Sequence, residues 1–359
     1  MGSHRRLGGR FMPLLAGAAV AAAGGLAGCK PTVDPGLTST PAPSVSVSLA
    51  ATPTTDPSPQ PATPQAAATV TTATGAPSVS TTTQPSAQVV AAPAAPATFP
   101  NAGNTGVPAG VTLIDYTGPR EITKANTVIQ NVRIKGGSRI IISAPGVVIR
   151  NSVISTGDTF GVSVNNDDVP NASVVVEDSE FVGSYDPNPA DEMAIRGRGW
   201  TIRRVEIRGF RDGGGIDGNN VIEDSYIHDF VVSSACEHAD GLQGLGNTSN
   251  ITIRHNTIDM ALDHCMAGVI QLGTEFGSNH NVTVDDNWLA GGSWIFYSSL
   301  LPGISSDNIK FTNNHLSKKY FPNYGVYGVC HNWIAGIAGV QWSGNVDADS
   351  GKVIQAPVT

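Results

Sequence analysis

The stretch Ile251-Thr-Ile-Arg-His-Asn-Thr-Ile258 decides the fold, because close variants of it recur along the chain. Two further copies read Val282-Thr-Val-Asp-Asp-Asn-Trp-Leu289 and Ile309-Lys-Phe-Thr-Asn-Asn-His-Leu316. One apolar position can be followed through eight copies, at intervals of 27, 26, 20, 31, 31, 27 and 31 residues. These eight anchors are Ile149, Val176, Ile202, Ile222, Ile253, Val284, Phe311 and Trp342. Repetition at this period is typical of a solenoid, in which each repeat contacts only its neighbours.

Each copy alternates apolar and polar residues, is rich in Val and Ile, and has no helical stripe, so we interpret each copy as a strand. An interval near 26 leaves room for roughly three short strands and three turns. The sequence therefore predicts an all-β protein, a right-handed parallel β-helix solenoid of about nine coils. Leucine-rich repeats have a similar period, but the Leu-x-x-Leu-x-Leu frame that they need is not found here.

The repeated phrase resembles the pectate-lyase-like superfamily of right-handed parallel β-helix proteins, over about residues 110–359. Such folds include polysaccharide lyases, glycoside hydrolases, sugar epimerases and non-catalytic surface proteins. The resemblance therefore implies a substrate class and leaves the chemistry open. The ordered motifs of polygalacturonases and the Arg-rich patch of calcium-dependent pectate lyases are not found, so no specific activity is implied.

The N-terminus has the layout of an export signal. Arg5 and Arg6 precede an apolar run from Phe11 to Leu26, and the run ends in Leu26-Ala-Gly-Cys29. This ending resembles the bacterial lipoprotein box, which predicts a signal peptide over residues 1–28 and lipid on Cys29. The alternatives are an ordinary signal peptide or an uncleaved anchor, although a run of about 16 residues is short for a span that needs roughly 20.

Residues 29–105 consist almost entirely of Pro, Thr, Ser, Ala, Val and Gln, with very few charges. Such a segment buries too little apolar surface to offset its ordering entropy, so we expect a disordered tether. Residues 106–359 then form the β-helix domain, large enough for one core. We expect an extracytoplasmic protein held at the cell membrane by the lipid on Cys29.

The net charge of the chain limits the classes of partner that we expect it to bind. A formal net charge of -8 without clustered Lys and Arg argues against nucleic acid and against adsorption to anionic lipid headgroups. We therefore expect contact with the membrane through the N-terminal lipid only, a monomeric chain, and a polysaccharide as substrate or ligand.

Three cysteines follow Cys29. Cys236 and Cys265 lie about one coil apart at nearly equivalent positions, which predicts a disulfide in an exported protein. Cys330 would then be free and buried. The alternative is that none of them pair; no Cys-x-x-Cys spacing suggests a metal site.

A second row of residues is expected on the strand that opens each coil. Pairs such as Leu242-Gln243 and Ile270-Gln271 place an apolar residue toward the core and its successor toward solvent. The predicted outward row is Asn165, Arg196, Asp217, Gln243, Gln271, Phe296 and Tyr327.

This row is suited to sugar recognition. Amides and a carboxylate pair with hydroxyls, Arg196 can take a uronate carboxylate, and the rings of Phe296 and Tyr327 can cover a pyranose. The alternative for Gln243 and Gln271 is a purely structural amide ladder.

The densest group of ionisable residues is Cys236-Glu-His-Ala-Asp-Gly-Leu-Gln243. In an extended segment His238 and Asp240 share a side, and a carboxylate beside an imidazole suits a general acid or base. Asp217 could supply a second carboxylate, as in a hydrolase. In a lyase, Arg196 would instead neutralise a uronate. The alternative is structural, because Asp-Gly is a common turn dipeptide.

Calcium is left open as a cofactor. The oxygens of Asn165-Asn-Asp-Asp168 are of the type that calcium prefers, but the spacing of a calcium-binding loop is not present, and we interpret the segment as a loop. The sequence thus predicts a lipid-anchored, tethered β-helix that binds a polysaccharide and is either a lyase or hydrolase or a non-catalytic adhesive protein.

Overall fold

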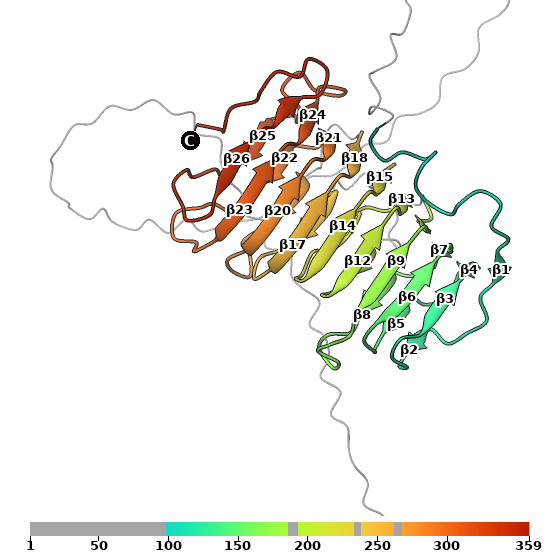
Figure 1. Ribbon diagram of the computed structural model, residues 1–359. Coiled ribbons are helices and arrows are strands. Elements are labelled where there is room, and N and C mark those ends of the chain that lie inside the picture. Colours follow the sequence, from blue (N-terminus) through green and yellow to red (C-terminus); the bar gives the residue numbers. More distant parts are fainter. Residues whose placement is uncertain (1–97, 186–192, 233–237, 262–267, 359) are drawn as a thin grey trace, which may run out of the picture. The chain divides into compact units, whose positions relative to one another are not determined.

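The computed structural model describes residues 98–185, 193–232, 238–261 and 268–358. These residues form parallel strands stacked into long sheets, the arrangement of a parallel β-helix (Figure 1). They contain no helix, and so none that is long and apolar enough to cross a membrane. The predicted all-β solenoid of about nine coils is confirmed, since the two longest sheets have ten and nine strands.

The two long sheets each take one strand from almost every coil. The ten-stranded sheet contains β1 (Ile114–Asp115), β4 (Val132–Lys135), β7 (Val153–Ser155), β10 (Glu180–Val182), β13 (Glu206–Arg208), β15 (Tyr226–His228), β18 (Thr257–Met260), β21 (Trp288–Gly291), β24 (His315–Ser317) and β27 (Val346–Asp347). The nine-stranded sheet contains β3 (Val128–Gln130), β6 (Val147–Arg150), β9 (Val174–Glu177), β12 (Trp200–Arg203), β14 (Asn220–Glu223), β17 (Ser249–Arg254), β20 (His280–Asp285), β23 (Asp307–Thr312) and β26 (Gln341–Ser343).

The third side of the coil, which we call the split sheet, consists of two four-stranded pieces. The first contains β2 (Glu121–Ile122), β5 (Ile140–Ile142), β8 (Phe160–Val164) and β11 (Met193–Arg196). The second contains β16 (Leu242–Gly244), β19 (Gly268–Leu272), β22 (Trp294–Tyr297) and β25 (Gly328–His331). Isolated parallel bridges from Met193 to Asp212 and from Gly215 to Gln243 carry the stacking across the coil between them.

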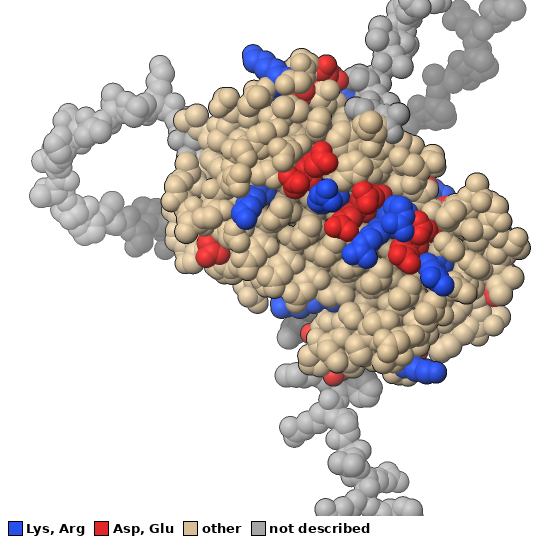
Figure 2. Space-filling model, in the orientation of Figure 1, with Lys and Arg blue, Asp and Glu red and all other residues tan. Residues whose placement is uncertain are grey.

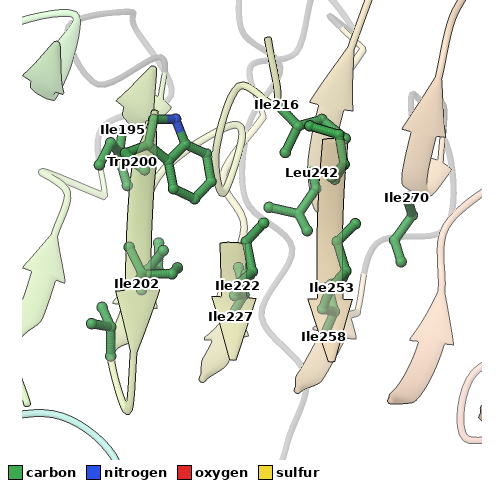
Figure 3. Close-up of a cluster of buried hydrophobic side chains, with 14 of the residues drawn as sticks. Ile195, Trp200, Ile202, Ile216, Ile222, Ile227, Leu242, Ile253, Ile258 and Ile270 are labelled. Atoms are coloured by element: carbon green, nitrogen blue, oxygen red, sulfur yellow. The ribbon is translucent and has the colours of Figure 1, made fainter. Parts of the chain in front are cut away.

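The eight predicted anchors lie in one register along the nine-stranded sheet. Ile149 opposes Val176, and the series continues without a slip to Phe311 opposite Trp342. The anchors are buried apart from the half-buried Trp342, and Figure 3 shows Ile202, Ile222 and Ile253 in this stack. The change from a 20-residue to a 31-residue interval therefore leaves the register of this sheet unchanged.

The repeated phrase is longer than one strand, which corrects the interpretation of each copy as a single strand. In the copy around Ile253, β17 ends at Arg254, a two-residue turn follows, and β18 begins at Thr257 in another sheet. The first turn residue, His255, has φ +50°, and the second, Asn256, is fully buried. Asn, Asp and His recur at the first turn position because they tolerate the left-handed conformation better than most residues do.

The buried turn residues form a ladder inside the coil. The backbone N–H of Asn256 donates to Oδ1 of Asn287 at 2.9 Å, and Asn287 donates in the same way to Asn314 at 3.1 Å. Asn314 continues to Asn345 at 3.0 Å. Each side-chain amide thus satisfies backbone groups that would otherwise be buried without partners, and it fixes the register of neighbouring coils.

The outer surface of the nine-stranded sheet carries alternating charges. In-register neighbours run Arg150, Glu177, Arg203, Glu223, Arg254 and Asp285. Figure 2 shows this alternation of blue and red over the sheet. Arg203 Nε lies 3.0 Å from Glu223 Oε2 and Arg254 Nε lies 3.9 Å from Asp285 Oδ2. Opposite charges directly across parallel neighbours favour this register over a shifted one.

Candidate carbohydrate-binding face

The outward side of the split sheet carries one row of side chains in register. Gly215 opposes Gln243, Gln243 opposes Gln271, Gln271 opposes Tyr297, and Tyr297 opposes His331. The inward neighbours Leu242, Ile270 and Phe296 are fully buried, so alternation directs the row outward. We call this row, together with Arg196 and Asp217, the split-sheet face.

Arg196 extends the row on the other side of Gly215. The bridge between Met193 and Asp212, continued by three residues along both chains, sets Arg196 beside Gly215. The hydrogen bond from the Gly215 N–H to the carbonyl of Ile195, at 2.9 Å, agrees with this pairing. Because Gly215 has no side chain, the face is open between Arg196 and Gln243.

A pocket of about 140 Å³ occupies this opening. Arg196, Asp217 and Gln243 supply its polar lining, and Phe160, Met193 and Leu245 supply most of the rest. The Asp217 carboxylate accepts the backbone N–H of Gly197 at 3.1 Å, which holds it at the edge of the pocket. The pocket therefore combines one cation, one carboxylate and one amide with an apolar floor.

Arg196 is exposed, and it has neither an ion pair nor a side-chain hydrogen bond with any residue that the structure describes. Its guanidinium carbon lies 4.7 Å from the centroid of the Phe160 ring. Arg139 covers the same ring at 4.5 Å, but its guanidinium is bound to Asp158 at 2.6 Å. Stacking on Phe160 thus positions Arg196 and leaves its N–H groups available to an anion.

Gln243 and Gln271 share one buried carboxylate. Nε2 of Gln243 donates to Oδ2 of Asp240 at 3.0 Å. The amide of Gln271 is assigned so that its Nε2 faces both Asp240 oxygens at 2.8 Å, since the reverse would set its carbonyl oxygen against the carboxylate. Oδ1 of Asp240 also accepts the N–H of Gly268 at 2.8 Å. Asp240 therefore receives donors from β16 and β19.

Burial is the largest influence on the ionisation of Asp240. It raises the pKa of this carboxyl, and the charge of the nearby Asp212 raises it further. The hydrogen bonds from Gln243 and Gly268 and the charge of Arg211 act in the opposite direction. Asp212 accepts the backbone N–H of Asp240 at 2.7 Å and lies 3.3 Å from Arg211 Nη2.

The C-terminal end of the face is aromatic. The rings of Tyr297 and His331 have centroids 4.8 Å apart, and Trp294 lies 5.4 Å from His331 and 6.0 Å from Tyr327. A pocket of about 210 Å³ lies here, lined by Gln271, Glu275, Tyr297, His331 and their neighbours. Aromatic rings beside amide and carboxylate oxygens form a surface that is partly apolar and partly hydrogen-bonding.

Tyr297 and His331 are both uncharged near neutral pH. Burial raises the pKa of Tyr297 to about 12, helped by the charges of Asp240 and Tyr327. Burial lowers the pKa of His331, and its Nδ1 is buried without a hydrogen-bond partner. The pocket thus contains a phenol that keeps its proton and an imidazole that is neutral.

The structure brings most of the predicted row to one face. Gln243 and Gln271 are in register, and Arg196 and Asp217 line the pocket beside Gln243. Asn165 also follows a strand of the split sheet, but Arg196 pairs with Ser163, so Asn165 lies two residues further on. Their roles in binding stay predictions.

Two aromatic predictions need correction. Phe296 is fully buried and stacks on Phe311 at 4.4 Å, so the prediction that it faces solvent is wrong, and Tyr297 occupies the outward position. Tyr327 is 68% exposed, but it lies four residues before His331, which is the residue in register with Tyr297.

The predicted pairing of His238 with Asp240 is not found. His238 is exposed whereas Asp240 is fully buried, and in the described part of the chain no hydrogen bond or ion pair joins them. The two residues therefore occupy different environments. Asp240 and Asp217 also differ, because Asp217 reaches the pocket and Asp240 lies beneath the amides.

Sequence reasoning missed Phe160, Tyr297 and His331. Tyr297 belongs to the run Trp294-Ile-Phe-Tyr297, in which no polar residue marks the outward positions. The motif Gly328-Val-Cys-His331 gave a usable signal, because the buried Cys330 fixes His331 as outward.

The cysteine and metal predictions are tested only in part. Cys330 is free and buried as predicted, and burial raises the pKa of its thiol to about 12. Cys236, Cys265 and Cys29 lie outside the described residues. Within the described ranges, no three His, Cys, Asp or Glu side chains are grouped to hold a metal ion. In the segment proposed for calcium, Nδ2 of Asn165 donates to Asp168 at 3.3 Å.

Comparison of the chain with protein-family models, with curated proteins and with solved structures gives no match. The geometry of the split-sheet face is therefore the basis for a functional proposal.

Proposed function

We propose that the split-sheet face binds a polysaccharide laid along the axis of the β-helix. The observation that carries this proposal is the in-register outward row of amides and rings, together with one guanidinium that is unpaired among the described residues. A pocket lies on either side of the Gln243–Gln271 pair. A linear polymer repeats along its length as a solenoid does, so successive rungs can contact successive sugars. From Arg196 to His331 the face has six rungs, separated by five strand spacings that together measure about 24 Å.

The pocket at Arg196 suits an acidic sugar. A guanidinium without an ion pair among the described residues can bind a carboxylate through two parallel hydrogen bonds. The planar face of Phe160 holds it in place, which reduces the side-chain entropy lost on binding. The preferred ligand is therefore a polysaccharide that contains uronic acid or another anionic group.

The pocket at Tyr297 suits the apolar face of a pyranose. Rings of Tyr297, His331 and Trp294 lie together, and Glu275 and Gln271 border them with hydrogen-bonding atoms. An amphipathic sugar ring buries its C–H face on aromatic carbon and directs its hydroxyls to the polar border. Glu275 disfavours a second anionic sugar at this end.

Cleavage of the bound chain is a second candidate function, and one observation favours it. The neutral imidazole of His331 beside the protonated phenol of Tyr297 gives a base and an acid in one pocket. Cleavage of a glycosidic bond needs such a pair, because one group takes up a proton while the other protonates the departing oxygen. His238 and Asp240 are less suited as this pair, since Asp240 is buried and His238 is exposed.

The test uses the full-length chain and isothermal titration with a panel of acidic and neutral oligosaccharides. We expect an acidic oligosaccharide to bind, with weaker binding to Arg196→Gln and Tyr297→Ala. Arg150→Gln is the matched control, because Arg150 lies on the nine-stranded sheet and contacts Gln130. Absence of binding across the panel, or equal losses in the control, would refute the proposal.

The same incubations separate binding from cleavage. New reducing ends together with ultraviolet absorbance of an unsaturated uronate indicate a lyase, and reducing ends alone indicate a hydrolase. Binding with neither product identifies a non-catalytic carbohydrate-binding protein.

We further propose that lipid on Cys29 and the tether present this face outside the cytoplasm. The support is the sequence alone, namely the apolar run ending in Leu26-Ala-Gly-Cys29 and the Pro-rich segment after it. Replacing Cys29 with Ala should release the protein from the membrane fraction of the cell that produces it. Retention in that fraction would contradict a lipid anchor.

A further inference from the structure

We propose that Asp240 is a positioning residue that makes the split-sheet face a hydrogen-bond acceptor, by holding the N–H₂ groups of Gln243 and Gln271 beneath the surface. The inference deepens the proposed polysaccharide function and rests on it for its ligand. It names the ligand class at the centre of the face, which is a sugar unit that donates hydroxyls to two neighbouring amide carbonyls.

The geometry begins with the donors that reach the carboxylate. Gln243 Nε2 is 3.0 Å from Oδ2, and the Gly268 N–H is 2.8 Å from Oδ1. The amide atom of Gln271 that we assign as Nε2 is 2.8 Å from both oxygens. An ionised carboxylate accepts hydrogen bonds only, so each of these partners must present an N–H to it. Both glutamine carbonyl oxygens are therefore on the side of the amide away from Asp240.

A glutamine side chain alone does not choose between its two edges. In solvent the amide rotates freely, and either the carbonyl or the N–H₂ group can meet a ligand. Fixing two amides one rung apart removes that freedom before the ligand arrives, which lowers the entropic cost of binding. It also makes the face selective for ligands with hydroxyl donors, because a site built for such donors rejects a ligand that lacks them.

The surroundings of the buried Asp240 carboxyl disfavour its ionised form. Asp240 is fully buried, and Asp212 accepts its backbone N–H at 2.7 Å, which places a second carboxylate close by. Arg211, 3.3 Å from Asp212, offsets part of this repulsion, and among the described residues Tyr297 also interacts with Asp240. A charge that opposes folding in this way is expected where the charge is needed for function.

Protonation of Asp240 would reverse the arrangement. A protonated carboxyl donates one hydrogen bond, and Gln271 would turn its carbonyl oxygen inward to accept it. The outward edge of that amide would then change from acceptor to donor. Because burial and Asp212 both raise the pKa of Asp240, this change occurs at a higher pH than for an ordinary aspartate.

The first experiment needs no ligand. Side-chain amide resonances of Gln243 and Gln271 in the full-length chain are assigned by nuclear magnetic resonance, using Gln243→Ala and Gln271→Ala. We expect both N–H₂ groups to be protected from solvent exchange and to shift together as the pH is lowered. In Asp240→Asn this shared titration should disappear, and its persistence there would overturn the inference.

The second experiment uses whichever acidic oligosaccharide the full-length chain binds. Asp240→Asn keeps the size of the side chain but replaces one carboxylate oxygen with an N–H₂ donor. It therefore cannot accept hydrogen bonds from the N–H₂ groups of both glutamines at the two positions. We expect roughly tenfold weaker binding above pH 8, where the Asp240 carboxyl of the unmodified chain is ionised, with an unchanged or higher melting temperature. Asp286→Asn is the control, at a turn position with φ +53° that Asn tolerates, and should bind as the unmodified chain does.

The two failures are distinguishable. If no oligosaccharide binds the unmodified chain, the proposed function fails and the resonance experiment still tests the positioning role. If the unmodified chain binds and Asp240→Asn binds equally well, the positioning role is refuted while the proposed function stands.

Discussion

The nine-stranded sheet and the split-sheet face are built from the same coils, yet their polar side chains differ in whether they have interaction partners. On the nine-stranded sheet, Arg203 pairs with Glu223 and Arg254 with Asp285 across neighbouring strands. On the split-sheet face, Arg196 has no such partner among the described residues, and Nδ1 of His331 has no hydrogen bond. Polar groups that satisfy one another maintain register, whereas polar groups left open are available to a ligand.

The ten-stranded sheet resembles the nine-stranded sheet, because charged side chains on it also pair with one another. Glu206 contacts His228 at 3.0 Å, Arg208 contacts Glu180 at 3.0 Å, and Asp259 contacts Lys319 at 2.7 Å. Each of these charged groups thus has an oppositely charged partner. Paired charges are thus found on the ten-stranded sheet, whereas Arg196 on the split-sheet face is unpaired among the described residues.

The largest effect is expected from breaking the buried ladder in the turns between the nine-stranded and ten-stranded sheets. Asn287 accepts from Asn256 and donates to Ile253, Asp285 and Asn314, so Asn287→Leu leaves several buried groups without partners. We expect a loss of about 3–5 kcal/mol in the free energy of unfolding, measured by chemical denaturation.

The control for this change is an exposed ladder in the same coils. Asn281 donates to Asn250 at 3.2 Å and has φ +57°, which Gly adopts readily. Asn281→Gly should cost about 1 kcal/mol or less, because water replaces the lost bond. Equal losses in the two variants would contradict a special role for the buried ladder.

A somewhat smaller effect concerns the pH dependence of stability at Asp240. Its folded-state pKa is raised above the unfolded value near 3.9, so between the two values the folded chain binds more protons than the unfolded chain. Stability from this group therefore falls as the pH rises through that window, by up to about 1.4 kcal/mol per pH unit. Denaturation curves of Asp240→Asn should lack this fall. An unchanged slope would show that Asp240 does not titrate there.

Next in size is the contribution of the aromatic end to binding. Tyr297→Ala removes a ring from the larger pocket and should weaken oligosaccharide binding by about 0.5–1.5 kcal/mol, without a matching loss of stability. Tyr297→Phe keeps the ring and should retain most of the affinity, measured by isothermal titration. If Phe is as damaging as Ala, the hydroxyl is the important group and ring stacking is not.

The smallest effects are expected from two arginines, one with an ion pair and one without an ion pair among the described residues. Arg203 and Glu223 are partly exposed, so Arg203→Gln should cost less than about 1 kcal/mol in stability and leave binding unchanged. Arg196→Gln should leave stability unchanged and weaken binding of an acidic oligosaccharide, and the remaining binding should depend less on salt. Identical behaviour of the two variants would remove the distinction between the faces.

Much of the fold could be predicted because its physical determinants are local. A strand with one buried side must alternate, and a slip of one residue would expose the whole apolar set. The anchors from Ile149 to Trp342 therefore fall in register even where the intervals differ by 11 residues, 20 against 31. The division of each phrase between two sheets was less visible, because the left-handed turn at residues such as His255 occupies only two positions.

The candidate site could be predicted only where alternation was unambiguous. Leu242-Gln243 and Ile270-Gln271 each pair one apolar with one polar residue, and both glutamines lie on the predicted row. Trp294-Ile-Phe-Tyr297 has apolar or aromatic residues at all four positions, so the sequence does not say which side faces solvent. The burial of Asp240 beneath two amides depends on three coils together, which no local spacing reveals.

The account's central claim is that ligands bind on the split-sheet face, and photo-crosslinking tests it most directly. The full-length chain is irradiated with an acidic oligosaccharide that carries a photoreactive group, and the modified peptides are identified by mass spectrometry. The account predicts crosslinks on peptides that contain Arg196, Gln271 or Tyr297, suppressed by excess unmodified oligosaccharide. Competed crosslinks confined to β12, β14 and β17 of the nine-stranded sheet would contradict it.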